Sequence, residues 1–316
     1  MTIEELNAVN ASGGMDEFIR VCEARQIKEL ARIADRICGV DAAASPRAPQ
    51  KRIVLLAGGS SAGKTTTAKR LCTQLRVNGF EATHFSTDDY FVGDKRNPRD
   101  ENGEFDYEHV ECVYIPRLSS DLNALVRGES VHMRKFDFRA HDGYDDPSVT
   151  SITDDGFIVL EGIHALNPRL TEGVDEALKF RVFIEPRSDL EVFVHTCLSS
   201  RETRLVRRIV RDASFRGMSP ATTFAMWPKV IAGEDKWILP FRGNADAEFN
   251  SALSYELAVL RNYAAGAIHL LLKKDPSNVP ARMLAELLSL IDPVSPVSVP
   301  GDSILRETIG GSQLIY

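Results

Sequence analysis

The chain has 316 residues, of which 43% are hydrophobic and 26% charged, and this ordinary globular composition excludes disorder throughout. The net charge of -7 argues against a broad nucleic-acid-binding surface, which needs an excess of Lys and Arg. No apolar run approaches the roughly 20 residues that span a bilayer, and the five scattered cysteines suit reduced thiols in a cytosol. We therefore expect a cytoplasmic protein that binds neither nucleic acid nor a membrane, and the possibility of a homo-oligomer stays open.

Helices and strands are predicted to alternate along the chain, since apolar residues recur at helical spacing in some segments and as short β-branched runs in others. An amphipathic helix over 15–38 stops at Gly39, and a Pro-containing linker follows over 42–50. Further helices are predicted over 65–77, 119–127, 190–211, 247–263 and 282–291. Strands are predicted over 53–57, 81–86, 157–160, 180–184 and 267–272, with an edge strand over 131–138 and a turn over 141–147.

This alternation predicts an α/β fold in which a parallel sheet is flanked by helices on both faces. In such sheets, ligands bind at the carboxyl ends of the strands. The motifs that carry chemistry are therefore expected to follow the predicted strands directly.

A glycine-rich loop joins the first predicted strand to the next helix, and it matches G-x-x-x-x-G-K-[ST] in full. It reads Gly58, Gly59, Ser60, Ser61, Ala62, Gly63, Lys64, Thr65. Glycines let backbone N–H groups turn inward and form an anion-binding concavity at the helix N-terminus. We expect Lys64 to reach the β- and γ-phosphates of ATP, Thr65 to ligate Mg²⁺, and Thr66 to join the nucleotide site. The alternative is a Gly/Ser-rich turn that matches by chance.

Carboxylates follow two of the predicted strands. Asp88 and Asp89 come after the second strand, and Glu161 follows the strand over 157–160. Asp88 is expected to accept the proton of an attacking hydroxyl, and Glu161 to hold a water molecule of Mg²⁺. Strand-end carboxylates also serve as helix N-caps, which is the alternative for both residues.

One predicted helix has a strongly basic face. Arg204, Arg207, Arg208 and Arg211 recur at i, i+3, i+4 and i+7, so their side chains share one side. Arginines that fold over a nucleotide would neutralise the transferring phosphoryl group and exclude water. We expect an arginine-rich lid over about 201–217, with a solvated face paired to nearby acidic residues as the alternative.

In these motifs and their order, the sequence resembles the uridine kinase family of P-loop small-molecule kinases, which is related to phosphoribulokinase. The matching segments are GGSSAGKT (58–65), STDDYF (86–91), FDYEHV (105–110), KFDFRAH (135–141), VLEGIHAL (159–166) and RLVRRIVRDASFRG (204–217). The resemblance implies an ATP- and Mg²⁺-dependent kinase that phosphorylates the 5′-hydroxyl of a uridine- or cytidine-like nucleoside.

The resemblance also implies roles for residues of the donor side. It assigns Asp88 as the base for the 5′-hydroxyl and Glu161 as the carboxylate on the metal side. The lid arginines of the family correspond to Arg204 and Arg207, which we assign to catalysis. Arg208 and Arg211 are the further lid arginines, assigned to the nucleotide.

An acceptor pocket is implied by the same resemblance. Asp106 would hold the ribose hydroxyls, while Phe136, Phe138 and His141 would pack against or hydrogen-bond the base. Tyr90, in the STDDYF segment, is assigned to the same pocket. The alternatives are a cap for Asp106, a core position for the two phenylalanines and an ordinary surface position for His141.

One departure leaves the acceptor open. After the histidine, uridine–cytidine kinases commonly have Ser-Arg near the base, whereas this chain has Asp142-Gly143. A sugar phosphate, a polyol or a vitamin alcohol is an alternative acceptor, with Arg134, Lys135 and Arg139 available for a phosphorylated one. A non-catalytic nucleotide-binding module is the third hypothesis.

These motifs divide the chain into three parts. Residues 1–50 are expected to form an N-terminal helical extension and linker. Residues 51–275 would form the kinase domain with its lid, and residues 276–316 a C-terminal helix and tail that pack on the core.

Overall fold

A computed structural model describes residues 1–40, 51–138, 140–193 and 196–315. The predicted linker over 42–50 and the candidate residue Arg139 lie outside these described residues.

The described residues form a central five-stranded sheet in the order β2-β5-β1-β6-β9, and every neighbouring pair is parallel. Its strands are β1 (Ile53–Ala57), β2 (Ala82–Ser86), β5 (Phe157–Glu161), β6 (Lys179–Glu185) and β9 (Ala247–Asn250). The strands β1 and β5 are buried along their whole length, as strands covered on both faces are. The predicted α/β fold with a helix-flanked parallel sheet is confirmed.

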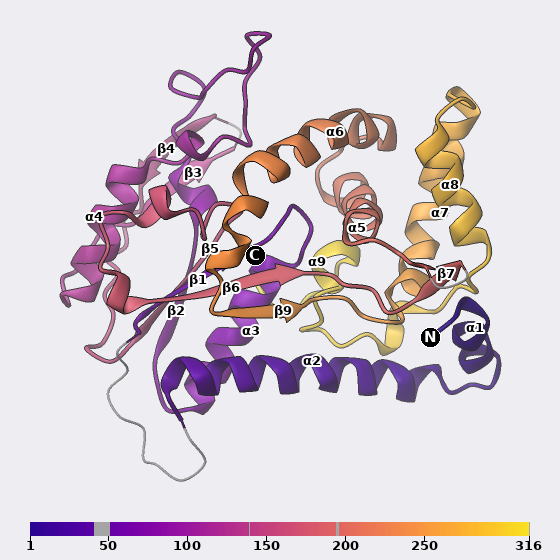
Figure 1. Ribbon diagram of the computed structural model, residues 1–316, viewed down its shortest axis with the longest axis horizontal. Helices are drawn as coiled ribbons and strands as arrows, with labels where there is room; N and C mark the ends of the chain where they lie inside the picture. Colours follow the sequence, from indigo (N-terminus) through magenta and orange to yellow (C-terminus); the bar gives the residue numbers. More distant parts are fainter. Residues whose placement is uncertain (41–50, 139, 194–195, 316) are drawn as a thin grey trace.

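Helices cover both faces of this sheet (Figure 1). On one face lie α2 (Met15–Cys38), which has the predicted bounds, and α3 (Lys64–Val77). Their apolar side chains share a core with Val54 of β1. On the other face, α4 (Ile115–Val126) shares a second core with Leu55 of the same strand. The side chains of successive residues of β1 thus pack into opposite cores, because side chains alternate between the two faces of a strand.

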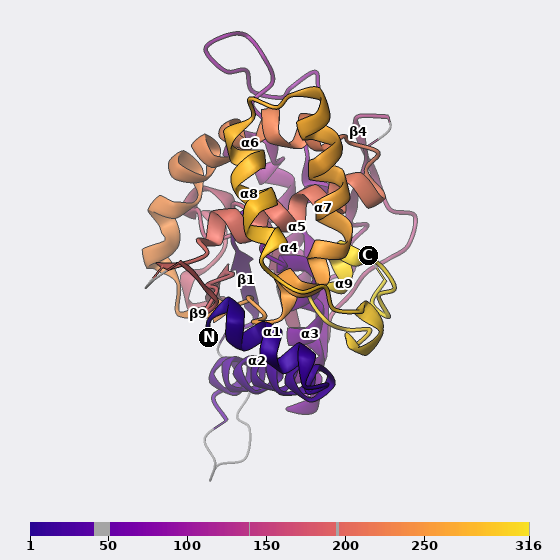
Figure 2. The same ribbon diagram turned by 90° about the vertical axis from the view of Figure 1, so that its right-hand side faces the viewer.

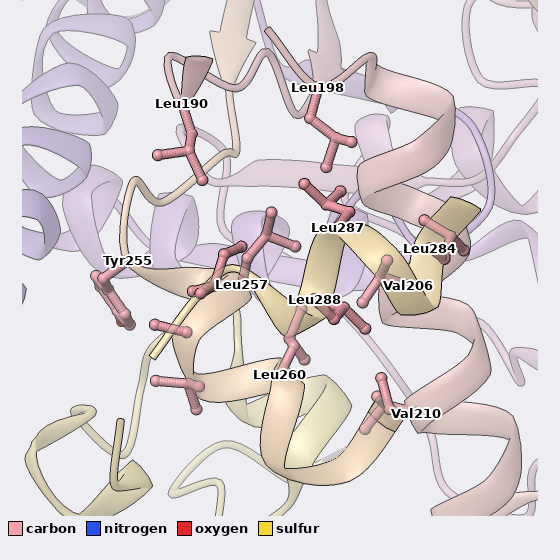
Figure 3. Packing of buried hydrophobic residues seen from close by; sticks show 14 of the residues in the cluster. Leu190, Leu198, Val206, Val210, Tyr255, Leu257, Leu260, Leu284, Leu287 and Leu288 are labelled. Carbon is pink, nitrogen blue, oxygen red and sulfur yellow. The ribbon is translucent and has the colours of Figure 1, made fainter. Parts of the chain in front are cut away.

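A third apolar core lies beside the sheet and consists mainly of helices. Figure 3 shows its leucines packed against Val206 and Val210. Figure 2 shows the helices α7 (Glu256–Lys274) and α8 (Val279–Ser289) side by side. Residues from both ends of the chain meet here, and the Asn7 amide donates to the carbonyl of Leu290 at 2.8 Å. The helices of this layer are α1 (Ile3–Ala11), α5 (Ser200–Phe215), α6 (Pro220–Trp237), α7 (Glu256–Lys274), α8 (Val279–Ser289) and α9 (Arg306–Ile309).

The helix predicted over 190–211 is shorter in the structure and starts later. Its first part is a small hairpin of β7 (Glu191–Phe193) and β8 (Thr196–Cys197). The helix α5 then begins after Ser199, whose hydroxyl accepts the backbone N–H of Glu202 in a capping box. This cap fixes the N-terminus at a point that the hydrophobic pattern alone does not mark.

Two predictions in the last third of the chain are wrong. The helix predicted over 247–263 begins as the strand β9, because Ala247–Asn250 pairs in parallel with β6 at the edge of the sheet. The strand predicted over 267–272 lies inside α7, where Ile268 and Leu271 are buried at i, i+3 while Leu270 is exposed. Short apolar runs do not distinguish a buried strand from a helix face.

The hairpin β3 (Arg134–Asp137) and β4 (Asp142–Asp145) stands apart from the main sheet. It replaces the single edge strand and the turn that were predicted there. The helix α6, which carries Pro228 in its interior, is not predicted from the sequence at all. None of the helices within the described residues is long and apolar enough to cross a membrane.

Candidate active site

The order of the strands brings three chemical groups to one edge of the sheet. Strand β5 lies between β1 and β2, and Glu161 at its end pairs in register with Leu56 and with Ser86. The phosphate loop leaves β1 one residue after Ala57, and Asp88 follows β2 by two residues. The loop, Glu161 and Asp88 are therefore neighbours because the carboxyl ends of β1, β5 and β2 are adjacent.

The phosphate loop has a conformation that only certain residues allow. Ser61 and Gly63 both have positive φ, at 61° and 85°, which turns the backbone into an anion-binding nest before α3. A side chain at Gly59 would collide with the guanidinium of Arg204, so the loop rests directly on that arginine. The ammonium of Lys64 donates to the carbonyl of Gly59 at 3.3 Å and so lies over the loop.

Two oxygen-bearing residues predicted for the metal side lie in contact. The Thr65 hydroxyl donates to Oε1 of Glu161 at 3.0 Å. Mg²⁺ prefers oxygen ligands and is held by one or two protein groups together with substrate phosphates. Among the described residues there is no cluster of three or more His, Cys, Asp and Glu that would hold a metal alone. Thr65 and Glu161 thus suit Mg²⁺ delivered with a nucleotide.

The charge on Glu161 is stabilised by its neighbours. Burial would raise its pKa, but His84, Lys64 and the Thr65 hydroxyl outweigh this effect and hold the pKa below its usual range. The Nε2 atom of His84 lies 3.9 Å from Oε1 of Glu161. Glu161 is therefore ionised at neutral pH, as a metal-side carboxylate must be.

Asp88 differs from Glu161 in the direction of its pKa shift. It lies in a 3-10 turn over Thr87–Tyr90, and its backbone N–H donates to the Ser86 hydroxyl at 3.2 Å. Burial of the carboxylate in the cleft and the nearby charge of Glu161 raise the pKa of Asp88 to about 6, although Lys64 and Arg216 oppose the shift. Its side chain still reaches solvent through the open cleft. A carboxylate with this pKa is suited to accept a proton near neutral pH.

One cavity of about 520 Å³ joins these groups. It contains the phosphate loop and both carboxylates, and it extends to aromatic and basic side chains from distant parts of the chain. Its lining residues are Ser60, Ser61, Gly63, Lys64, Thr65, Asp88, Phe91, Tyr107, Glu108, Phe138, Glu161, Ile163, Arg208, Arg211, Arg216 and Glu307.

The basic face of α5 is divided between two environments. Arg208 and Arg211 line the cavity together with Arg216 just beyond the helix, and Arg208 donates to the Ser60 hydroxyl at 2.8 Å. Arg204 and Arg207 do not line it and are each only 1% exposed. Besides Lys64, the positive charge of the cavity therefore comes from Arg208 and Arg211 on the basic face of α5 and from Arg216, a residue not predicted for the site.

Arg204 and Arg207 are held beneath the phosphate loop by buried ion pairs. Arg204 pairs with Glu234 of α6 at 2.6 Å, and Arg207 pairs with Glu256 of α7 at 2.6 Å. Arg204 also donates to the carbonyl of Ser60 at 3.3 Å, and Arg207 donates to that of Ser61 at 3.4 Å. The predicted solvated alternative does not apply to these two arginines, because their partners are buried glutamates.

The aromatic residues lie at the outer end of the cavity. Phe138 is 60% exposed and lines the cavity with Phe91, and their ring centroids are 6.1 Å apart in an edge-on arrangement. Phe136 lies behind them, with its centroid 5.1 Å from that of Phe138. Tyr90 is not in the cavity: it is a core residue, and its hydroxyl donates to Asp121 at 2.9 Å. The 3-10 turn thus directs Tyr90 inward and Phe91 outward.

The other predicted acceptor residues, Asp106 and His141, do not line this cavity. Asp106 lines an adjoining hollow of about 270 Å³ that shares Tyr107 and Glu108 with the main cavity, and it accepts the backbone N–H of Glu108 at 3.2 Å. His141 is an exposed residue with a φ of 52°, and its Nδ1 lies 3.4 Å from Oδ1 of Asp94. The structure brings Phe138 to the main cavity but not Asp106 or His141.

Several lining residues were not predicted. Phe91, Glu108 and Arg216 lie in the segments STDDYF, FDYEHV and RLVRRIVRDASFRG, but the sequence of these segments does not show in which direction each side chain points. Burial raises the pKa of Glu108 to about 7, although Arg208 and Lys64 oppose the shift. Glu307 gives no local signal, because it reaches the cavity from a segment near the C-terminus.

Comparison with known proteins identifies the family. A family model described as Phosphoribulokinase / Uridine kinase family matches residues 53–257. The chain belongs to this family. Membership confirms the family that was predicted from the sequence. It also confirms the predicted class of enzyme, a kinase that transfers a phosphoryl group to an alcohol. The matched range contains all five strands of the central sheet and the arginine-bearing helix α5.

Two uridine kinases are similar to this chain in sequence. The one from Halobacterium salinarum is 32% identical over 162 residues, which cover 51% of this chain and 63% of that protein. The one from Deinococcus deserti is 26% identical over 179 residues, which cover 57% of this chain and 77% of that protein. The chain thus spans less than two thirds of the Halobacterium relative.

Two solved structures described as kinases have lower sequence identity to this chain. A structure described as a possible uridine kinase from Bacillus stearothermophilus is 17% identical, with a TM-score of 0.45, and the match covers 72% of this chain and all of that one. A D-glycerate 3-kinase from Cryptococcus neoformans is 14% identical, with a TM-score of 0.27, over 88% of this chain and 85% of that one.

Proposed function

We propose that this chain is an ATP-dependent nucleoside kinase that transfers the γ-phosphoryl group to the 5′-hydroxyl of a nucleoside and releases the 5′-monophosphate. One observation carries the proposal. A single cavity contains a phosphate loop, a carboxylate with a pKa near 6 and an aromatic wall. These are the groups that a triphosphate, an attacking hydroxyl and a planar base would respectively need.

On the donor side, the backbone N–H groups of the loop and Lys64 would bind the β- and γ-phosphates. Thr65 and Glu161 would hold Mg²⁺, which supplies positive charge to the phosphates when bound. Arg208, Arg211 and Arg216 would neutralise the charge that develops on the transferring phosphoryl group. Arg204 and Arg207, which contact loop carbonyls from below, would keep the loop in shape.

On the acceptor side, Asp88 would take the proton of the 5′-hydroxyl as its oxygen attacks the γ-phosphorus. The oxygen–phosphorus bond to the nucleotide breaks as the new one forms, so ADP leaves with the bridging oxygen and no covalent enzyme intermediate is needed. Asp88 is suited to this role because its raised pKa leaves it ionised, yet basic, at neutral pH.

The exposed ring of Phe138 and the edge of Phe91 offer apolar surface to a base, since aromatic rings pack in stacked or edge-on pairs. Asp106 would hold the ribose diol, as the resemblance implied, and its position in the adjoining hollow puts it next to Tyr107 and Glu108. A pyrimidine base is favoured by the two relatives named uridine kinases.

An unphosphorylated acceptor is favoured by the state of two basic residues. Arg134 is 8% exposed and donates to the carbonyl of Phe91 at 2.9 Å. Lys135 forms a 2.8 Å ion pair with Asp89. Both side chains are engaged within the protein, so neither is ready to bind an acceptor phosphate. This observation argues against a sugar phosphate as the substrate.

The test is a panel of acceptors incubated with ATP labelled at the γ-phosphate. Ribonucleosides, deoxyribonucleosides, sugar phosphates, polyols and vitamin alcohols are compared under one set of conditions. The proposal predicts labelled 5′-monophosphate from at least one nucleoside and much slower transfer to the other classes. Transfer to no nucleoside, or a clear preference for a phosphorylated acceptor, would overturn it.

A further inference from the structure

The last segment of the chain forms part of the wall of the nucleotide site. In Figure 1 the short helix α9 lies near α5, with which it is in contact. Ile304 is 2% exposed, and a side chain at Gly63 would come within 2.6 Å of its Cγ2 atom. The loop can adopt its φ of 85° at Gly63 against this segment only because no side chain is present there.

The segment is firmly anchored. Leu305 and Ser303 are completely buried, and the backbone N–H of Leu305 donates to the Ser303 hydroxyl at 3.2 Å. The guanidinium of Arg306 donates to carbonyls of its own segment, including Val299 at 2.6 Å and Pro296 at 2.8 Å. A side chain that follows directly after these anchors is held in a defined place.

That next residue is Glu307, which lines the same cavity as Lys64 and Thr65. Its Oε2 atom accepts a hydrogen bond from the Thr66 hydroxyl at 2.7 Å. Thr66 itself is completely buried and does not line the cavity, so this hydrogen bond holds the Glu307 carboxylate in place at the cavity wall. Any triphosphate in the cavity therefore lies near a carboxylate of like charge.

Positive charge near Glu307 moderates this repulsion. Burial lowers the pKa of Lys69, and the carboxylates of Glu161 and Glu307 oppose that shift, so Lys69 is close enough to feel both. Lys64 and the cavity arginines also attract the triphosphate. Glu307 thus weakens the binding of the phosphate donor, which the rest of the site binds strongly.

We infer that Glu307 sets the affinity of the enzyme for its phosphate donor by placing a carboxylate from the C-terminal segment against the Thr66 end of the phosphate loop. This inference rests on the proposed function, in which the loop binds ATP. A weaker hold on the donor suits turnover, since tight and equal binding of the ground and transition states does not raise the rate.

The experiment measures ATP binding by isothermal titration calorimetry in the absence of acceptor. Glu307→Gln keeps the shape and removes the charge, and we expect it to bind ATP about five-fold or more tightly, because one unit charge at close range contributes at least this much even in water. The gain should shrink at high salt, and the KM for the acceptor should stay unchanged. Glu307→Ala should also bind ATP more tightly, which guards against a failure of the first variant to fold.

Asp302→Asn is the matched control, because it removes the same charge from the same segment but lies outside the cavity lining. Its ATP affinity should equal that of the wild type. Equal or weaker ATP binding by both Glu307 variants would overturn the inference and leave the proposed function standing. Failure of the wild type and of every variant to bind ATP would overturn the proposed function as well.

Discussion

The donor and acceptor halves of the cavity are built in different ways. The donor half consists of strand ends, a helix N-terminus and two buried ion pairs, including the 2.6 Å contact of Arg207 with Glu256. The acceptor half consists of a 3-10 turn, a two-stranded hairpin and exposed rings such as Phe138. Phosphate chemistry needs fixed groups, whereas recognition of an acceptor can be altered through loops on a constant scaffold. Asp88 stands where the two halves meet.

The largest expected effect comes from removing the base at this junction. Asp88→Asn should lower kcat by about 10²- to 10⁴-fold, because the amide cannot accept the proton of the hydroxyl. Binding of ATP should persist, since the donor half is intact, and calorimetry checks this separately from turnover. A variant that retains near-normal kcat would show that Asp88 is not the base.

The next largest effect should come from the cavity arginines. Arg216→Ala is expected to lower kcat by roughly 10²-fold, as loss of a group that stabilises transition-state charge typically does. Arg201→Ala is the matched control, because Arg201 pairs with Asp235 away from the cavity lining. Steady-state kinetics of both variants compares them. Equal losses in the two would contradict the role of Arg216 in the cavity.

A third prediction concerns the rigidity of the donor half. Glu256→Gln should lower the free energy of unfolding by about 3–5 kcal/mol, because it leaves the guanidinium of Arg207 buried without its counter-charge. Glu248→Gln, which breaks exposed pairs with Arg187 and Arg242, should cost about 1 kcal/mol or less. Urea denaturation measures both. Similar values for the two variants would mean that the buried pair does not support the loop.

The smallest effect is expected in the acceptor half. Phe138→Ala should raise the KM for the acceptor by about two- to ten-fold, since one aromatic contact contributes roughly 0.5–1.5 kcal/mol. The KM for ATP should not change. Tyr144→Ala, on the same hairpin and also exposed, is the control and should leave both constants unaltered. A rise in the KM for ATP instead would place Phe138 at the donor.

Much of the donor half could be predicted because its signals are local. The loop motif is contiguous, and Asp88 and Glu161 follow strands whose pairing is fixed by the fold. What could not be predicted was which arginines face the cavity. Arg204 turns away from it because Glu234, which lies in a helix that the hydrophobic pattern did not reveal, forms its buried partner.

Other errors have the same origin in distant partners. Ala247–Asn250 is a strand only because the edge of β6 is available to it. Tyr90 turns inward because Asp121 on α4 accepts its hydroxyl. Glu307 reaches Thr66 across 241 positions of the chain, and no local pattern predicts such a contact.

The most direct test of the central claim is the pH dependence of kcat/KM for the nucleoside at saturating ATP. Since the pKa of Asp88 is raised to about 6, the base is protonated below that pH, and kcat/KM should fall as the pH decreases through about 6. Glu108, whose pKa is raised to about 7 in the same cavity, is the control, and Glu108→Gln should keep the fall near pH 6. A profile without a fall between about pH 5 and 7, or the same fall in Asp88→Asn, would contradict the account.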